Sequence, residues 1–304
     1  MRRRRGRYTS PKRSMKHRWT CPLCDGTQKL DATYKQDSYG RWRWFIGCFS
    51  TNCPEGPEYL AVLADAVGAR PWQILEDPVR WLQHLGSSSP SLLTPAPLPS
   101  IGQIEDWHRA LLTDKRALHY ITRQRGLTRQ TIRMYLLGFD GQAIVIPVIA
   151  RGHRVVNVRR RFLSPRANGP KIIGVRGHAA HLYPGMIRRR AFVLCEGEFD
   201  ALIARQHGLP AVTSTAGTSW SQSWNRYAAR RRIAVLYDAG KRSFQLACDR
   251  AESLVSAGAE NAWAVDLRRA GLASGEDITD WFLTHDFSVE KLLTLIRSRR
   301  REKD

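Results

Sequence analysis

Four cysteines near the start of the chain have the spacing of a metal site. Two residues separate Cys21 from Cys24, four separate Cys48 from Cys53, and 23 lie between the pairs. Close pairs in tight turns, joined by a hairpin, supply the tetrahedral thiolates that Zn²⁺ requires. We therefore predict a structural zinc site from these four residues. Ordinary reduced cysteines are the alternative, and disulfides are disfavoured in a reducing compartment.

A basic and aromatic stretch, YGRWRWF at 39–45, lies between the cysteine pairs. Alternation along a strand would put Arg41 and Arg43 on one face and Trp42 and Trp44 on the other. Arginine contacts phosphate and indole rings stack on bases, so Arg41, Trp42 and Arg43 are candidates for binding single-stranded DNA. The equally weighted alternative has both tryptophans pointing inward over a small zinc core.

Carboxylates follow three expected strands in the C-terminal half. Glu196 comes directly after AFVLC, Asp238 directly after IAVLY, and Asp277 follows AWAVDL. The carboxyl ends of parallel strands form one edge of a sheet, so these acids are predicted to converge. Clustered carboxylates repel one another and are tolerated best around Mg²⁺ or Mn²⁺. Taken singly, each is better explained as a helix cap or a surface charge.

The elements that must position these residues form a mixed α/β chain, α+β overall. Residues 58–85 are predicted to be helical, and the Gly/Ser/Pro-rich residues 86–100 to be a linker. From residue 190, strands alternate with helices, which predicts a parallel sheet covered on both faces. The other expected elements are helices at 105–124 and 128–138 and strands at 143–150, 154–162 and 171–175.

The charge composition restricts the class of partner. There are 49 Lys+Arg and 27 Asp+Glu, a net charge of +22. Residues 1–18 carry +9 of it and residues 297–304 carry +3, so the rest of the chain is basic too. Such a charge attracts polyanions, nucleic acid first. Neither a long apolar run nor a secretory signal is visible, so we expect a cytoplasmic protein without a membrane partner.

The acidic motifs together resemble the TOPRIM fold of bacterial and phage DNA primases. The matching residues are Glu196-Gly197-x-x-Asp200, Thr215-Ala216-Gly217-Thr218, Leu236-Tyr237-Asp238 and Glu276-Asp277. The residues ahead of them resemble the basic N-terminal subdomain of the primase core: Tyr120-Ile121, Gly138-Phe139, Ile146-Pro147-Val148, Arg159-Arg160-Arg161, Pro170-Lys171 and Leu182-Tyr183. The cysteine segment resembles the primase zinc-binding domain, so the resemblance covers about residues 19–285.

The domain organisation follows from this resemblance and the composition. The expected parts are a disordered basic arm at 1–18, a zinc-ribbon domain at 19–85, the linker at 86–100, a basic α+β subdomain at 101–188, a TOPRIM parallel-sheet domain at 189–286, and a C-terminal helix with a basic tail at 287–304.

The resemblance implies a DNA primase, a nucleotidyltransferase that makes short RNA primers from NTPs on single-stranded DNA. Its catalytic acids would be Glu196, Asp200, Asp238 and Asp277. Of these, Glu196, Asp238 and Asp277 would hold Mg²⁺ or Mn²⁺. The candidates for contact with template or nucleotide are Arg159, Arg160, Arg161, Lys171 and Lys241. For the arginine run, a solvated strand face is the alternative.

The sequence departs from the family pattern in four features. The family's D-x-D motif is Asp238-Ala239-Gly240 here, which lacks the second acid; Glu198 is a candidate substitute. Four cysteine ligands, in place of three cysteines and a histidine, are more phage-like. No G-x4-G-K-[ST] helicase loop is present, and the chain is shorter than cellular replicative primases.

These departures leave two functions open. We expect a stand-alone primase from a phage or mobile element, acting in a bacterial host cell with a separate replicative helicase as a further partner. The alternative is a degenerate primase-like module that binds single-stranded DNA without synthesis. Another TOPRIM activity is disfavoured, because a topoisomerase needs further domains and a positioned tyrosine nucleophile.

Overall fold

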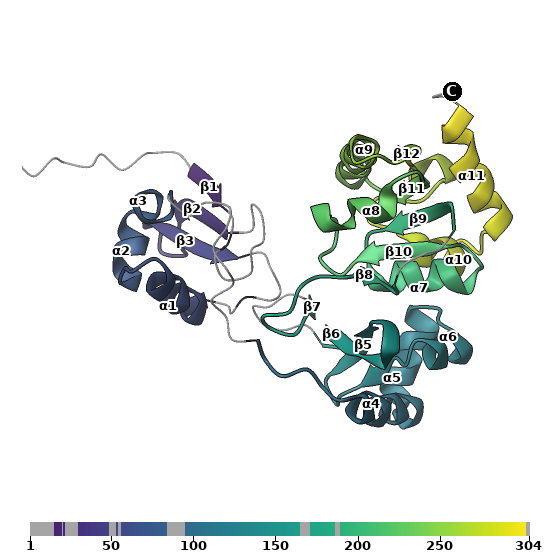
Figure 1. Cartoon of the computed structure of the whole chain (residues 1–304), viewed down its shortest axis with the longest axis horizontal. Helices are drawn as coiled ribbons and strands as arrows, with labels where there is room; N and C mark the ends of the chain where they lie inside the picture. The colour runs from purple at the N-terminus through teal and green to yellow at the C-terminus, as the bar shows by residue number, and fades with distance from the viewer. Residues whose placement is uncertain are drawn as a thin grey trace, which may run out of the picture. The chain divides into compact units, whose positions relative to one another are not determined.

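The computed structural model describes residues 15–19, 21, 30–48, 53, 56–83, 95–164, 171–185 and 189–301 (Figure 1). They belong to two compact units. The first comprises Met1–Ala96 with Val175–Ala179, and the second comprises Pro97–Gly174 with Ala180–Asp304. The described residues form three sheets with intervening helices, the mixed α+β class that the sequence predicts. None of the described helices combines the length and apolar composition needed to cross a bilayer.

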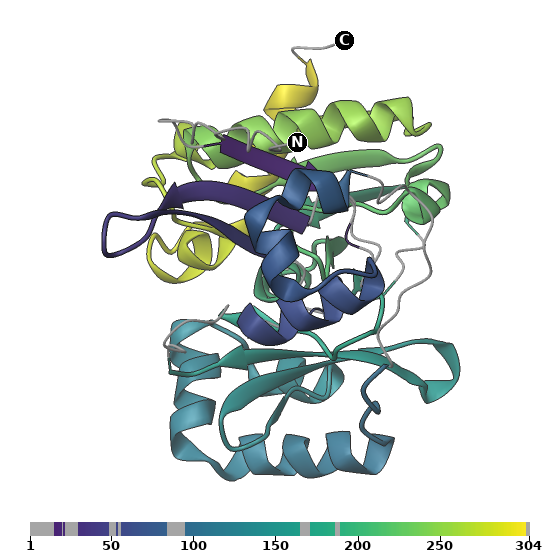
Figure 2. The same cartoon turned by 90° about the vertical axis from the view of Figure 1, so that its left-hand side faces the viewer.

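The first unit is built on an antiparallel sheet in the order β1-β2-β3. Its elements are β1 (Met15–Trp19), β2 (Leu30–Gln36), β3 (Trp42–Cys48), α1 (Gly56–Ala66), α2 (Pro71–Glu76) and α3 (Pro78–Leu82). Leu30 and Cys48 are register partners. Both pack in the core of this unit with Tyr59 and Leu63, which α1 supplies. Figure 2 shows the helices of this unit against its strands.

Two expectations for the first unit need correction. The basic arm at 1–18 was expected to be disordered, but its last residues form most of β1; residues 1–14 lie outside the described part. Met15, His17 and Trp19 alternate with more exposed residues, so this segment has a partly covered face that pairs along β2. The helical stretch at 58–85 is three helices, because Gly68 has φ +67 after α1 and prolines begin α2 and α3.

The second unit begins with helices packed on an antiparallel sheet in the order β4-β5-β6-β7. Its elements are α4 (Ile101–Thr113), α5 (Lys115–His119), the π-helix η1 (Tyr120–Gln124), α6 (Arg129–Met134), β4 (Gly138–Phe139), β5 (Ala143–Ile149), η2 (Arg151–His153), β6 (Val155–Phe162) and β7 (Ile172–Ile173). Thr128 caps α6 at the predicted start of this helix, which ends at Met134, four residues before the expected end. The expected helix at 105–124 is interrupted at Asp114, whose carboxylate accepts a hydrogen bond from the Ala117 amide at 2.7 Å and starts α5.

The remainder of the second unit is a five-stranded sheet in the order β12-β11-β9-β10-β8. Its elements are β8 (Leu182–Tyr183), β9 (Ala191–Cys195), α7 (Glu198–Gln206), β10 (Ala211–Ser214), η3 (Gln222–Trp224), α8 (Asn225–Ala228), β11 (Arg232–Leu236), α9 (Lys241–Ser256), β12 (Asn261–Ala264), η4 (Leu267–Ala270), α10 (Ile278–Leu283) and α11 (Val289–Arg301). The strands β9 to β12 pair in parallel, and β8 pairs antiparallel with β10.

Alternate residues of the parallel strands enter two different cores. Val193 and Cys195 of β9 pack with α7 and with the helices and sheet that precede it, whereas Phe192 and Leu194 pack with α9. Figure 1 shows α9 on one side of this sheet and α7 and α10 on the other. Both faces are therefore covered, as the apolar strand sequences predict.

Candidate zinc site and acidic active site

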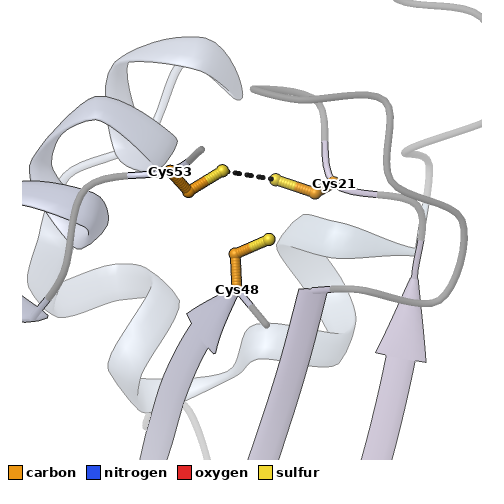
Figure 3. Close-up of side chains that lie close together, drawn as sticks. All are labelled: Cys21, Cys48 and Cys53. Carbon is orange, nitrogen blue, oxygen red and sulfur yellow. Dashed lines mark hydrogen bonds between the residues drawn. The ribbon is translucent and has the colours of Figure 1, made fainter. Parts of the chain in front are cut away.

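Three of the four predicted zinc ligands lie together in the first unit. The sulfur atoms of Cys21, Cys48 and Cys53 all lie within 4.8 Å of one another, and the Cys21 and Cys53 sulfurs are 3.6 Å apart (Figure 3). A disulfide would need about 2.05 Å. Tetrahedral zinc with Zn–S bonds of about 2.3 Å separates its sulfurs by about 3.8 Å, so the three thiols fit zinc. Cys24 lies outside the described residues.

A tyrosine that the sequence analysis did not single out contacts this site. The Tyr59 hydroxyl lies 3.3 Å from the Cys21 sulfur, and the ring is fully buried in the core beneath α1. Burial, together with the neighbouring cysteines, raises the pKa of Tyr59 far above its usual value, so the hydroxyl keeps its proton. It can therefore donate a hydrogen bond to a zinc-bound thiolate. Its place in the first helix after the last cysteine is the signal that could have identified it.

The arginines and tryptophans of β3 alternate between its two faces as predicted, but the tryptophans do not cover the cysteine core. Trp42 and Trp44 lie on one face of β3 and are half-buried, and Arg43 is exposed on the other. Both tryptophans pack on Tyr34, with ring centroids 5.5 and 5.1 Å away, rather than on the cysteine core. Arg41 and Arg43 both pair with Asp37, at 3.2 and 2.9 Å. The arginines that the sequence assigns to DNA thus share one carboxylate.

The predicted acids lie near one another at the carboxyl edge of the parallel sheet. Glu196 follows β9 and Asp238 follows the neighbouring strand β11, where Cys195 and Leu236 are register partners. Asp277 caps α10 and accepts hydrogen bonds from the amides of Thr279 and Asp280. Among the described residues, only the cysteine group brings three ligand atoms within 4.8 Å, so the carboxylates are spaced more widely than the thiols.

Negative charge is in excess at this edge of the sheet. Burial, then Glu196, Asp277 and Asp280, raise the pKa of Asp238 to about 7. Burial also raises the pKa of Glu196, although the Asp238 amide donates a hydrogen bond to its carboxylate. The Oε2 atom of Glu196 is buried and has no hydrogen-bond partner in the described residues. An orphaned carboxylate oxygen among repelling acids fits a divalent cation.

Asp200, the fourth predicted acid, is more deeply placed. It lies in the first turn of α7, is only 9% exposed, and accepts a hydrogen bond from the Gly197 amide at 2.9 Å. Burial, with Asp277 and Asp238 nearby, raises the pKa of Asp200 well above its usual value. Asp200 therefore shapes the turn that carries Glu196 and belongs to the same electrostatic cluster.

Two residues with expected surface or metal roles instead form a buried ion pair. The Arg159 Nε lies 2.8 Å from Glu198 Oε1, and the two side chains are 5% and 8% exposed. Glu198 is therefore paired with Arg159, which disfavours it as a substitute for the missing aspartate. Arg159 cannot lie on a solvated strand face. The sequence missed the pair because β6 and α7 meet only in the folded chain.

The remaining predicted basic residues are distributed over the second unit. Arg160 is half-buried and pairs with Asp140, and Arg161 is half-buried on β6. Lys171 is exposed next to β7. Lys241 is exposed at the first position of α9, three residues after Asp238. Lys241 is thus the predicted cation placed nearest in sequence to the acidic edge.

A basic pocket beside η1 was not anticipated. Its volume is about 630 Å³, and its lining includes Lys115, Arg116 and His119. Nearby, the Arg125 Nε donates to the Tyr120 hydroxyl at 2.9 Å, and the guanidinium lies 5.3 Å from the ring centre of Phe199. Cations grouped at a π-helix, where functional sites are frequent, indicate an anion-binding surface.

Comparison with known proteins gives no match by sequence: no protein-family model and no curated protein matches the chain. Solved structures do match. The zinc-binding and RNA polymerase domains of the Aquifex aeolicus primase superpose with a TM-score of 0.52 and 16% identity, over 93% of this chain and 78% of that one. The chain has the fold of a bacterial DNA primase.

Two further primase structures match part of the chain. A DNA primase domain from Pseudomonas aeruginosa has a TM-score of 0.51 and 17% identity, over 66% of this chain and 77% of that one. A DnaG primase catalytic domain bound to single-stranded DNA has a TM-score of 0.50 and 16% identity, over 65% of this chain and 79% of that one.

In this chain, the turn after Asp238 that lacks the second acid is hydrogen-bonded to the loop before Asp277. The Ala239 amide donates to the Glu276 carbonyl at 2.7 Å, and the Gly275 amide donates to the Ala239 carbonyl at 2.6 Å.

Proposed function

We propose that this chain is a DNA primase that synthesises short RNA primers from NTPs on a single-stranded DNA template. The observation that carries the proposal is the acidic edge: in a chain with the primase fold, Glu196 and Asp238 follow neighbouring strands, and Asp277 lies close enough to raise the pKa of both. A zinc-binding module precedes this core. Phage or mobile-element origin, a cytoplasmic location and a separate helicase partner belong to the same proposal.

The proposed chemistry divides between the acids and the basic surface. Divalent ions bound by Glu196, Asp238 and Asp277 would neutralise triphosphate charge and activate the attacking 3′-hydroxyl. Lys241, exposed at the start of α9, would contact the phosphates of the incoming nucleotide. The basic pocket with Lys115 and Arg116 would hold the template backbone. Asp200 keeps the Glu196 turn in shape through its bond to the Gly197 amide.

The test is synthesis without a primer. The protein is incubated with single-stranded DNA, NTPs and Mg²⁺ or Mn²⁺, and short RNA products are resolved on a gel. We expect product from the native chain and none from Asp238→Ala. As a control, Asp249→Ala removes an exposed acid of α9 and should leave synthesis unchanged.

A second function is favoured by one specific observation, the glycine at position 240. Without the second acid of the motif, the chain would bind single-stranded DNA as a replication module and make no primer. Tight DNA binding with no RNA under either metal would establish this module and overturn the enzyme.

A further inference from the structure

The amino ends of the parallel strands carry a cluster of arginines that the proposed reaction does not use. Arg189 and Arg190 precede β9, Arg230 and Arg231 precede β11, and Arg232 begins β11. The two strands are neighbours in register, with Arg232 opposite Ala191, and the Arg232 amide donates to the Arg190 carbonyl at 2.9 Å. The two arginine runs therefore lie side by side. We call these five residues the amino-edge arginines.

The amino-edge arginines form a concentrated positive surface. Arg189, Arg190 and Arg230 are exposed and Arg231 is half-buried, and the neighbouring loop before β12 supplies one carboxylate, Glu260, which pairs with Arg190 at 2.9 Å. The Nε of Arg232 is buried and has no hydrogen-bond partner in the described residues. Like charges held this close repel one another, so an external anion would stabilise the arrangement.

This surface is distinct from the acidic edge. Glu196 and Asp238 lie at the carboxyl ends of the same two strands, and β9 has five residues. At about 3.3 Å per residue, the strand separates the two edges by about 16 Å. A group bound by the arginines therefore cannot be the nucleotide bound at the acids.

We propose that the amino-edge arginines bind the phosphate backbone of a nucleic acid at a second site, on the edge of the sheet opposite the acids. All five cations are arginine, whose planar guanidinium binds phosphate oxygens in pairs, unlike the point charge of lysine. A nucleic-acid strand presents phosphates in a row, which suits two adjacent arginine runs. The inference does not depend on primer synthesis.

The test compares two triple variants with the same loss of charge. Arg189→Gln, Arg230→Gln and Arg231→Gln are combined in one protein. The control combines Arg129→Gln, Arg133→Gln and Arg297→Gln, exposed positions on α6 and α11. Binding to a 30-nucleotide single strand and to a 30-base-pair duplex is measured by fluorescence anisotropy across salt concentrations.

We expect the amino-edge variant to bind at least one of the two probes about tenfold more weakly, and the control less than threefold. The slope of log affinity against log salt should fall by about 2 to 3, from three lost phosphate contacts at about 0.7 to 0.9 each. The probe that loses affinity identifies the strand type. Equal losses in both variants would reduce the effect to net charge and overturn the proposal. Unchanged binding of both probes would also overturn the proposal. That result is expected if the arginines bind an acidic protein and not a nucleic acid. RNA synthesis is assayed separately, so failure here leaves the primase proposal standing.

Discussion

Replacing Arg159 with methionine should destabilise the second unit strongly, because it leaves the Glu198 carboxylate buried. The two charged atoms are 2.8 Å apart and the side chains are 5% and 8% exposed, so neither is well solvated. Removing one partner from such a pair typically costs about 3–5 kcal/mol. We expect Arg159→Met to lose about that much free energy of unfolding, measured by urea denaturation followed by circular dichroism.

The double variant Arg159→Met with Glu198→Met separates the pair from general packing. It removes both charges and fills similar volume, so it should recover most of the lost stability. Arg109→Met on α4 of the same unit is the control. Its pair with Asp106 is 67% and 60% exposed on the two sides, so its loss should stay below about 1 kcal/mol. A loss below about 1 kcal/mol for Arg159→Met, or no recovery in the double variant, would refute the assignment of Arg159 to the interior.

Three further predictions concern the metal sites. The pKa of Asp238 is raised from 3.8 to about 7 in the folded chain. Between these values the folded state holds a proton that the unfolded state has lost, so the free energy of unfolding of the metal-free chain should fall as pH rises from about 4 to about 7. Asp238→Asn should therefore stabilise the metal-free chain at pH 8 by about 1–2 kcal/mol after solvent screening, seen as a higher melting temperature. It should also reduce the rise in melting temperature on adding Mg²⁺. A lower melting temperature without Mg²⁺ would contradict this prediction. Tyr59→Phe should speed zinc loss to a chromogenic chelator several-fold by removing the hydrogen bond to Cys21, and an unchanged rate would show that this bond does not hold the metal. Gly240 has φ +159, a conformation that strains any side chain, although a Cβ there would meet only the Ser274 hydroxyl at 3.4 Å. Gly240→Asp should therefore lower the melting temperature of the metal-free chain and still lower the half-saturating Mg²⁺ concentration; an unchanged or higher concentration would show that position 240 does not face the ions.

Local patterns predicted the elements of the parallel sheet well. The strand AFVLC is β9 to the residue, and helices α7 and α9 follow β9 and β11 in the predicted alternation. These signals are local: continuous apolar runs mark buried parallel strands, and Thr128 marks a helix start by capping it. The cysteine spacing was equally informative, since three sulfurs meet although Cys21 and Cys53 are 32 residues apart.

Partnerships across the chain were beyond the sequence. Arg159 reads as one of three exposed arginines, and only the packing of β6 against α7 makes it the partner of Glu198. Gln206 is similar, because its side chain forms hydrogen bonds with the Thr128 amide, the Thr131 hydroxyl and the Gly126 carbonyl. No local sequence pattern predicts these bonds. Neither residue carries a spacing signal, because its partners lie about 40 to 80 positions away.

The most direct test of the acidic edge is a Mn²⁺ titration of the metal-free chain followed by electron paramagnetic resonance. The account predicts saturable binding that Glu196→Gln and Asp238→Asn each weaken at least tenfold, while Glu276→Gln, whose carboxylate is bonded to His285, has little effect. Equal binding by the native chain and both edge variants would contradict the claim that these carboxylates share a divalent ion.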